Sequence, residues 1–167
     1  MNDFIAVIDQ FYGFLMSGKS VVVELKQQSN YQFLIQFDAG IPSLLGDEPV
    51  PLGEGKGPSP VQLLAAAVGN CLSDSLFFAL QKFKQSPEPI HTIVQAEVGR
   101  NDEGRMRVLS MTAKLHLGVE ASELQHLDRV LEQFEAFCTV TQSVGQAIPI
   151  HTRVLDVKGV ILKDYEI

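Results

Sequence analysis

The stretch GPSPVQLLAAAVGNCLSDSLFFALQK, residues 57–82, decides how this chain folds, because it predicts one long helix with a cysteine at its middle. Ser59 is placed to cap the start of the helix and Pro60 suits its first position. Gln62 stands three residues after the cap, where it completes a capping box. Residues 57–73 contain no charged side chain, and small or apolar side chains occur on every side of the predicted helix. This pattern predicts a helix buried in the core, around which the rest of the chain packs.

The composition is that of one soluble globular domain. The chain has 167 residues, of which 46% are hydrophobic and 20% charged. Its net charge of −7 argues against nucleic acid or an anionic membrane surface as a partner. Its two cysteines form no CxxC motif, disulfide framework or metal-ligand cluster with histidine, so we expect no metal, no cofactor and a reducing, cytoplasmic location.

The N-terminal residues 1–16 have apolar side chains at helical spacing. They lack a basic leader, carry Asp3 and Asp9, and are too short to span a bilayer. We therefore expect residues 1–18 to form a helical extension, packed on the body or on a partner chain, and residues 19–167 to form a single domain.

The remaining patterns predict an α+β fold. A hairpin of strands at 20–26 and 31–37, with one face buried, precedes an irregular loop at 38–58. A strand is expected at 92–100 and a half-buried antiparallel strand at 106–117, followed by a closing strand or bent pair at 152–157 and 160–163. Between these segments, Ser122 and Gln125 repeat the capping-box signal, and they open a second helix whose apolar stripe ends at Cys138. Both cysteines are therefore expected to face inward.

Cys71 and Cys138 are the candidates for strong chemistry. Free cysteine is often a small buried hydrophobe, so a structural role is one reading of both residues. The other reading is a redox pair, because a thiolate oxidised by peroxide becomes a sulfenic acid that a second thiol must capture. A cysteine–histidine hydrolase pair has no motif to support it, since the four histidines are scattered through the sequence.

Several segments together resemble the osmotically inducible protein C and organic hydroperoxide resistance superfamily. They are GPSP at 57–60, LLAAA at 63–67 and GNC at 69–71, and then Cys138 followed by TVT at 139–141 and IPI at 148–150. The two cysteines lie 67 positions apart, close to the spacing in that family. The resemblance covers about residues 20–163 and leaves the N-terminal extension outside.

The resemblance implies an intertwined homodimer, in which a long buried central helix packs on curved antiparallel sheets. It implies a thiol-dependent peroxidase that reduces organic hydroperoxides in oxidative stress defence, with Cys71 as the peroxidatic residue and Cys138 as the resolving residue. A dithiol reductant, either a lipoyl protein or a small thiol, would then reduce the disulfide. An apolar substrate pocket is expected near Phe77, Phe78 and Phe137.

The chain departs from the family at the groups that activate the thiol. The peroxidases carry a glutamate ten residues before the reactive cysteine, where this chain has Val61, and an arginine from the N-terminal hairpin, whereas the first arginine here is Arg100. An unperturbed thiol has a pKa near 8.5, and lowering it by two units takes about 2.7 kcal/mol. Possible substitutes are Lys19, Lys56, Arg153 or a residue of the partner chain, although each lysine or arginine also reads as a solvated surface charge.

Two other functions stay open. The same dimeric fold could hold a small hydrophobic ligand in an apolar pocket, with structural or redox-responsive cysteines. Cys71 could also serve sulfur transfer or thiol modification. Thiol reactivity at neutral pH separates a reactive cysteine from a core thiol.

Overall fold

The structure is a computed structural model that describes residues 20–166. The predicted N-terminal helix and the extension over residues 1–18 lie outside the described residues. The chain divides into two compact units, Met1–Pro58 and Ser59–Ile167, and each is described by itself.

The first unit contains a three-stranded antiparallel sheet. Its strands are β1 (Glu24–Ser29), β2 (Gln32–Gln36) and β3 (Leu44–Gly46), in the order β1-β2-β3. The predicted hairpin is confirmed, although β1 begins four residues later than expected, and β3 lies inside the stretch that was expected to be an irregular loop. The prediction of a buried face was wrong, because Ile35 is the only strand side chain of β1 and β2 that is buried. A sheet buries a face only where a second layer covers it, and residues 20–58 contain no helix.

Asp47 orders the loop between β3 and the second unit. Its carboxylate accepts hydrogen bonds from the backbone N–H groups of Glu48, Glu54 and Lys56 and from the side chain of Gln32. These donors, with Lys56 as the strongest, hold the pKa of Asp47 below its ordinary value. The acidic loop is therefore a hydrogen-bonded structure built around one buried carboxylate.

The central helix α2 (Pro60–Gln81) begins as the sequence predicts. Ser59 caps it, and the reciprocal bonds between Ser59 and Gln62 complete the capping box. The helix is buried along one stripe instead of on all sides. The buried residues are Ala65, Val68, Gly69, Leu72, Leu76 and Leu80. By length and composition α2 could cross a membrane, but a core helix of a soluble protein satisfies the same criteria.

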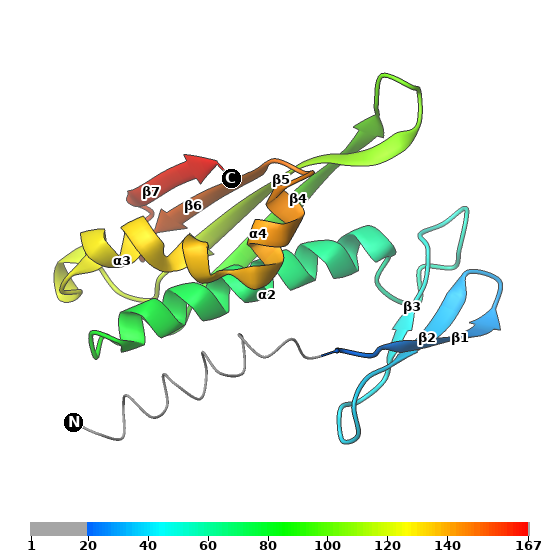
Figure 1. Ribbon diagram of the computed structural model, residues 1–167, viewed down its shortest axis with the longest axis horizontal. Helices are drawn as coiled ribbons and strands as arrows, with labels where there is room; N and C mark the ends of the chain where they lie inside the picture. Colours follow the sequence, from blue (N-terminus) through cyan, green and yellow to red (C-terminus); the bar gives the residue numbers. More distant parts are fainter. Residues whose placement is uncertain (1–19, 167) are drawn as a thin grey trace. The chain divides into compact units, whose positions relative to one another are not determined.

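A four-stranded sheet supports α2 (Figure 1). Its strands are β4 (His91–Arg100), β5 (Met106–His116), β6 (Ile150–Leu155) and β7 (Ile161–Glu166), in the order β4-β5-β6-β7. The sheet was expected to be antiparallel, and β4–β5 and β6–β7 are, but β5 and β6 run parallel. A parallel pair needs a crossover connection, which here is the helical segment between the two strands.

The crossover segment is broken where the sequence predicts one continuous second helix. It consists of the turns η1 (Ala121–Glu123) and η2 (Phe134–Phe137) and the helices α3 (Leu127–Gln133) and α4 (Thr139–Gly145). The predicted cap at Ser122 and Gln125 was wrong, because Glu120 and Glu123 form the capping box of η1. Cys138 has extended backbone angles, so it ends η2 and caps α4. The crossover packs on α2 through α3, η2 and α4 (Figure 1).

The core of the second unit lies between α2, the sheet and the crossover segment. Leu72, Met111, Phe134, Cys138 and Val154 are among its buried side chains. Gly69 lets α2 approach β4 closely, since a Cβ at this position would lie 2.8 Å from Val94 Cγ2. The molecule is thus α+β, with a long helix packed on a sheet, as the sequence predicts.

Candidate active site

The structure brings the two cysteines together. Cys71 lies near the middle of α2 and is half-buried, whereas Cys138 lies at the break between η2 and α4 and is fully buried. Both are free thiols, and the Cys138 thiol is placed to donate a hydrogen bond to the ionised Cys71. The predicted inward orientation holds fully for Cys138 and in part for Cys71.

The start of α4 supplies further donors to Cys71. The backbone N–H groups of Val140 and Thr141 donate hydrogen bonds to its sulfur. The N–H groups in the first turn of a helix have no partner within the helix, so they are free to bind an anion. Cys138 has an extended backbone and is the N-cap of α4, so the N–H groups of the first turn of α4 face Cys71 on α2.

These donors make Cys71 acidic. The Cys138 thiol has the largest effect, and together with the two N–H groups it lowers the pKa of Cys71 from 9.0 to about 6, against the opposing effects of burial and of Asp74. The hydrogen bond to Cys71 and burial both raise the pKa of Cys138. The first proton of the pair therefore leaves Cys71, which is the more exposed sulfur and accepts two backbone hydrogen bonds.

The cations proposed from the sequence have other partners. Arg153 Nε donates to Asp164 Oδ2 at 3.1 Å on the sheet, and Lys56 pairs with Glu54. Lys19 lies outside the described residues. Backbone donors carry no residue-type signature, which is why sequence reasoning missed them.

An aromatic cavity is lined by residues of the C-terminal part of α2 and of the crossover, and neither cysteine is among them. It has a volume of about 180 Å³. Its lining includes Phe78, Phe83, Phe134, Phe137, Lys82 and Arg129. Phe78 lies seven residues after Cys71, on the same face of α2 and about 10 Å along the helix. Phe137 directly precedes Cys138, so two of the three aromatic residues predicted to line a pocket do so, and Phe77 does not.

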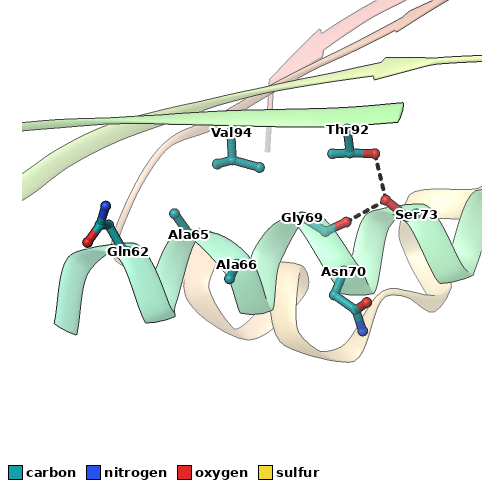
Figure 2. A pocket seen from close by; sticks show the side chains of 8 residues that line it. All are labelled: Gln62, Ala65, Ala66, Gly69, Asn70, Ser73, Thr92 and Val94. Atoms are coloured by element: carbon teal, nitrogen blue, oxygen red, sulfur yellow. Dashed lines mark hydrogen bonds between the residues drawn. The ribbon is translucent and has the colours of Figure 1, made fainter. Parts of the chain in front are cut away.

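A second hollow lies between α2 and β4, and neither cysteine lines it either. Its volume is about 380 Å³. Figure 2 shows its lining residues on α2 and β4, which are Gln62, Ala65, Ala66, Gly69, Asn70, Ser73, Thr92 and Val94. The Ser73 hydroxyl donates to the Gly69 carbonyl at 2.7 Å and lies 2.6 Å from Thr92 Oγ1 (Figure 2). At about 100° per residue, these α2 positions face nearly opposite to Cys71.

A buried ion pair holds the turn that precedes Cys138. Lys163 Nζ on β7 donates to Glu135 Oε2 at 2.7 Å and also to the Leu131 carbonyl. The two charged side chains are only 15% and 6% exposed. The Glu135 carbonyl in turn accepts hydrogen bonds from the Cys138 N–H and from the Gln142 side chain. Lys163 thus anchors η2, and with it the segment that carries Cys138, to the sheet.

The histidines lie away from the cysteines on the sheet strands or in the crossover. His91 and His116 are cross-strand neighbours with ring centroids 6.1 Å apart, and His151 bonds to Asp164. Within residues 20–166, no three side chains of the types His, Cys, Asp and Glu gather as a metal site would require.

Comparison with known proteins identifies relatives by sequence pattern and by fold. The sequence model of the family described as OsmC-like protein matches residues 53–153, which is more than half of the chain. No curated protein sequence matches the chain significantly.

Solved structures share the fold at low sequence identity. An OsmC-like protein from Mycoplasma pneumoniae is 12% identical with a TM-score of 0.68, covering 84% of this chain and 99% of that one. An organic hydroperoxide resistance protein OsmC from Legionella pneumophila is 16% identical with a TM-score of 0.64, covering 83% and 98%. The organic hydroperoxide resistance protein OhrB of Bacillus subtilis is 13% identical with a TM-score of 0.61, covering 80% and 97%.

Proposed function

The chain belongs to the OsmC-like protein family, and we propose that it reduces organic hydroperoxides with Cys71 as the peroxidatic residue and Cys138 as the resolving residue. The observation that carries the proposal is the acidic Cys71 thiol in hydrogen-bond contact with a second, buried thiol. A pKa of about 6 leaves Cys71 mostly as thiolate at neutral pH, which is the nucleophilic form.

The first step oxidises Cys71. Its thiolate attacks the terminal oxygen of the hydroperoxide, the O–O bond breaks, and the alkoxide takes up a proton to leave as an alcohol. The sulfur becomes a sulfenic acid. The N–H groups of Val140 and Thr141 hold the attacking thiolate in place, and they do so without the glutamate and arginine that the active peroxidases of the family carry.

The second step forms a disulfide. The Cys138 thiol loses its proton and attacks Cys71, the S–O bond breaks, and water leaves. A dithiol such as a lipoyl protein, or two small thiols, then reduces the disulfide and is itself oxidised to a disulfide. The aromatic cavity that includes Phe137, the neighbour of Cys138 in the chain, favours a hydroperoxide with an apolar body. We further propose that the protein works as a homodimer in the cytoplasm.

A second candidate function is the binding of a small hydrophobic ligand without turnover. The aromatic cavity and the absence of the activating glutamate and arginine favour this alternative. It predicts that the two thiols stay reduced in the presence of peroxide.

Mass spectrometry after treatment with one equivalent of cumene hydroperoxide tests the proposal. The wild type should rapidly lose two hydrogens and yield a linked Cys71–Cys138 peptide. Cys138→Ser should instead accumulate a sulfenic acid on Cys71, and Cys71→Ser should not react. Thiols that stay unchanged after prolonged exposure would reject the peroxidase and favour the binding function.

A further inference from the structure

The resolving step needs a group that helps Cys138 to ionise. Cys138 is fully buried, and burial raises the pKa of its thiol. The thiol must nevertheless lose its proton before it can attack, because a thiolate is the nucleophile in disulfide formation.

Thr141 is the side chain placed to help. Its hydroxyl oxygen lies 2.8 Å from Cys138 Sγ, and both side chains have no exposed surface. Cys138 caps α4 and Thr141 is the third residue of that helix, so the first turn of the helix fixes this contact. A hydroxyl can accept one hydrogen bond and donate another, so it can serve either form of the Cys138 thiol.

The contact changes direction when Cys138 loses its proton. In the uncharged pair, the Cys138 S–H donates to the Thr141 hydroxyl oxygen. In the resolving step Cys71 is an uncharged sulfenic acid, and Cys138 has no hydrogen left to donate once it has lost its proton. The Thr141 O–H is then left to donate to Cys138 Sγ, and a hydrogen bond from Thr141 lowers the pKa of Cys138.

We propose that Thr141 is a catalytic residue of the resolving step, in which its hydroxyl donates a hydrogen bond to Cys138 Sγ while that sulfur attacks the Cys71 sulfenic acid. The inference rests on the proposed function. In this step the S–S bond forms and the S–O bond breaks, and the departing hydroxide combines with the proton lost by Cys138 to give water. Thr141 stabilises the transient Cys138 thiolate and is itself unchanged.

The size of the effect follows from the hydrogen bond that is lost in Thr141→Val. Removing one donor from a charged sulfur lowers the thiolate population by about 10- to 100-fold. Part of this loss is offset, because a less acidic thiol is the better nucleophile once ionised. We therefore expect the rate of the Cys138 attack at neutral pH to fall by about 3- to 10-fold. The pH at which this rate levels off should be higher than in the wild type.

A test without peroxide isolates the attack by Cys138. Cys71 is first labelled as a mixed disulfide with one equivalent of 5,5′-dithiobis(2-nitrobenzoate), and release of the second thionitrobenzoate then reports the attack by Cys138. Thr141→Val should release it more slowly and with an alkaline-shifted pH profile. Thr141→Ser, which keeps the hydroxyl, should restore the rate. Circular dichroism checks folding, and Thr141→Ala replaces Thr141→Val if the valine variant does not fold.

A parallel measurement with cumene hydroperoxide separates this inference from the proposed function. Thr141→Val keeps the backbone N–H that binds Cys71, so its sulfenic acid should still form, and it should persist longer and give more sulfinic acid than in Thr141→Ser. Thionitrobenzoate release in Thr141→Val with the wild-type rate and pH profile would overturn the role of Thr141. If Thr141→Val slows thionitrobenzoate release as expected but the thiols of the wild type do not react with hydroperoxide, the role of Thr141 is supported and the peroxidase function is rejected.

Discussion

Cys71 ionises beside three hydrogen-bond donors, none of which carries a positive charge. The donors are the Cys138 thiol and the N–H groups of Val140 and Thr141. Hydrogen bonds to the charged form favour that form, so several neutral donors can replace one cation. This arrangement explains how a chain with no arginine before Arg100 can still hold a thiolate on its central helix.

The acidity of Cys71 predicts its pH dependence. Thiolate absorbance and alkylation of Cys71 should rise with a midpoint near pH 6. Because the folded pKa is depressed below the unfolded one, the ionised thiol stabilises the fold above the unfolded pKa, and this contribution is lost as the pH falls through about 6. Val140→Pro removes one N–H donor at a position in the first helical turn that tolerates proline, so it should raise the midpoint by about one unit or more.

The matched control for this variant is Thr139→Pro. Proline is favoured at the first helical position, and the N–H of Thr139 is not among the donors to Cys71. Its midpoint should stay near pH 6. If Val140→Pro also kept this midpoint while remaining folded, the backbone donors would not be the source of the acidity.

At the scale of the elements, the crossover segment is where the sequence is least informative. Leu124, Leu131, Phe134 and Cys138 are buried at the helical spacing that predicts one continuous helix. These side chains are nevertheless buried in a segment whose helix is broken before α4. Burial of apolar side chains is favourable whether or not the helical hydrogen bonds are continuous. By contrast, the start of α2 was predictable, since Ser59, Pro60 and Gln62 are local signals that need no tertiary contact.

The candidate site was predictable in part for the same reason. The resemblance identified Cys71 and Cys138, and the structure brings them into contact. The donors from Val140 and Thr141 are main-chain groups, which every residue has, so only the break before α4 reveals them. The parallel pairing of β5 and β6 was likewise hidden, because pairing direction depends on the path of the crossover and not on the strand pattern.

The Lys163–Glu135 pair gives the crossover a testable anchor. Lys163→Met leaves the Glu135 carboxylate buried without its cation, which should cost about 3–5 kcal/mol in urea unfolding. Burial raises the pKa of Glu135, and without Lys163 it should rise further, so the loss of stability should shrink as the pH falls and the carboxyl becomes protonated.

An exposed ion pair on the same unit is the control. Lys158→Met breaks the contact with Glu120, whose side chain is 39% exposed against 63% for Lys158. Its cost should be below about 1 kcal/mol. Equal losses in the two variants would show that the Glu135 pair is no special anchor.

At the scale of the whole molecule, many apolar side chains remain exposed in the single chain. The residues include Leu25, Phe33, Phe77, Ile93, Val98 and Leu109. Contiguous exposed apolar surface commonly marks a protein interface. We expect the proposed homodimer to cover part of this exposed apolar surface.

Light scattering tests the dimer. The expected mass is twice that of the chain at micromolar concentration. Phe33→Glu, which places a charge on the apolar side chain of β2, should shift the protein toward the monomer. Gln36→Glu adds the same charge at an exposed polar position of that strand and should not. A wild type with the mass of one chain would reject the dimer.

The placement of one cysteine on α2 and the other on the crossover has a consequence for how tightly the chain is held together during the cycle. A disulfide between them would close a loop of 67 residues. Closing a loop of that length lowers the conformational entropy of the unfolded chain, which stabilises the folded state by about 4 kcal/mol. The oxidised form would therefore resist heat and proteases better than the reduced form. Each turnover would alternate the disulfide-bonded form with the reduced form, and the reductant would act on the disulfide-bonded form, which is the more stable one.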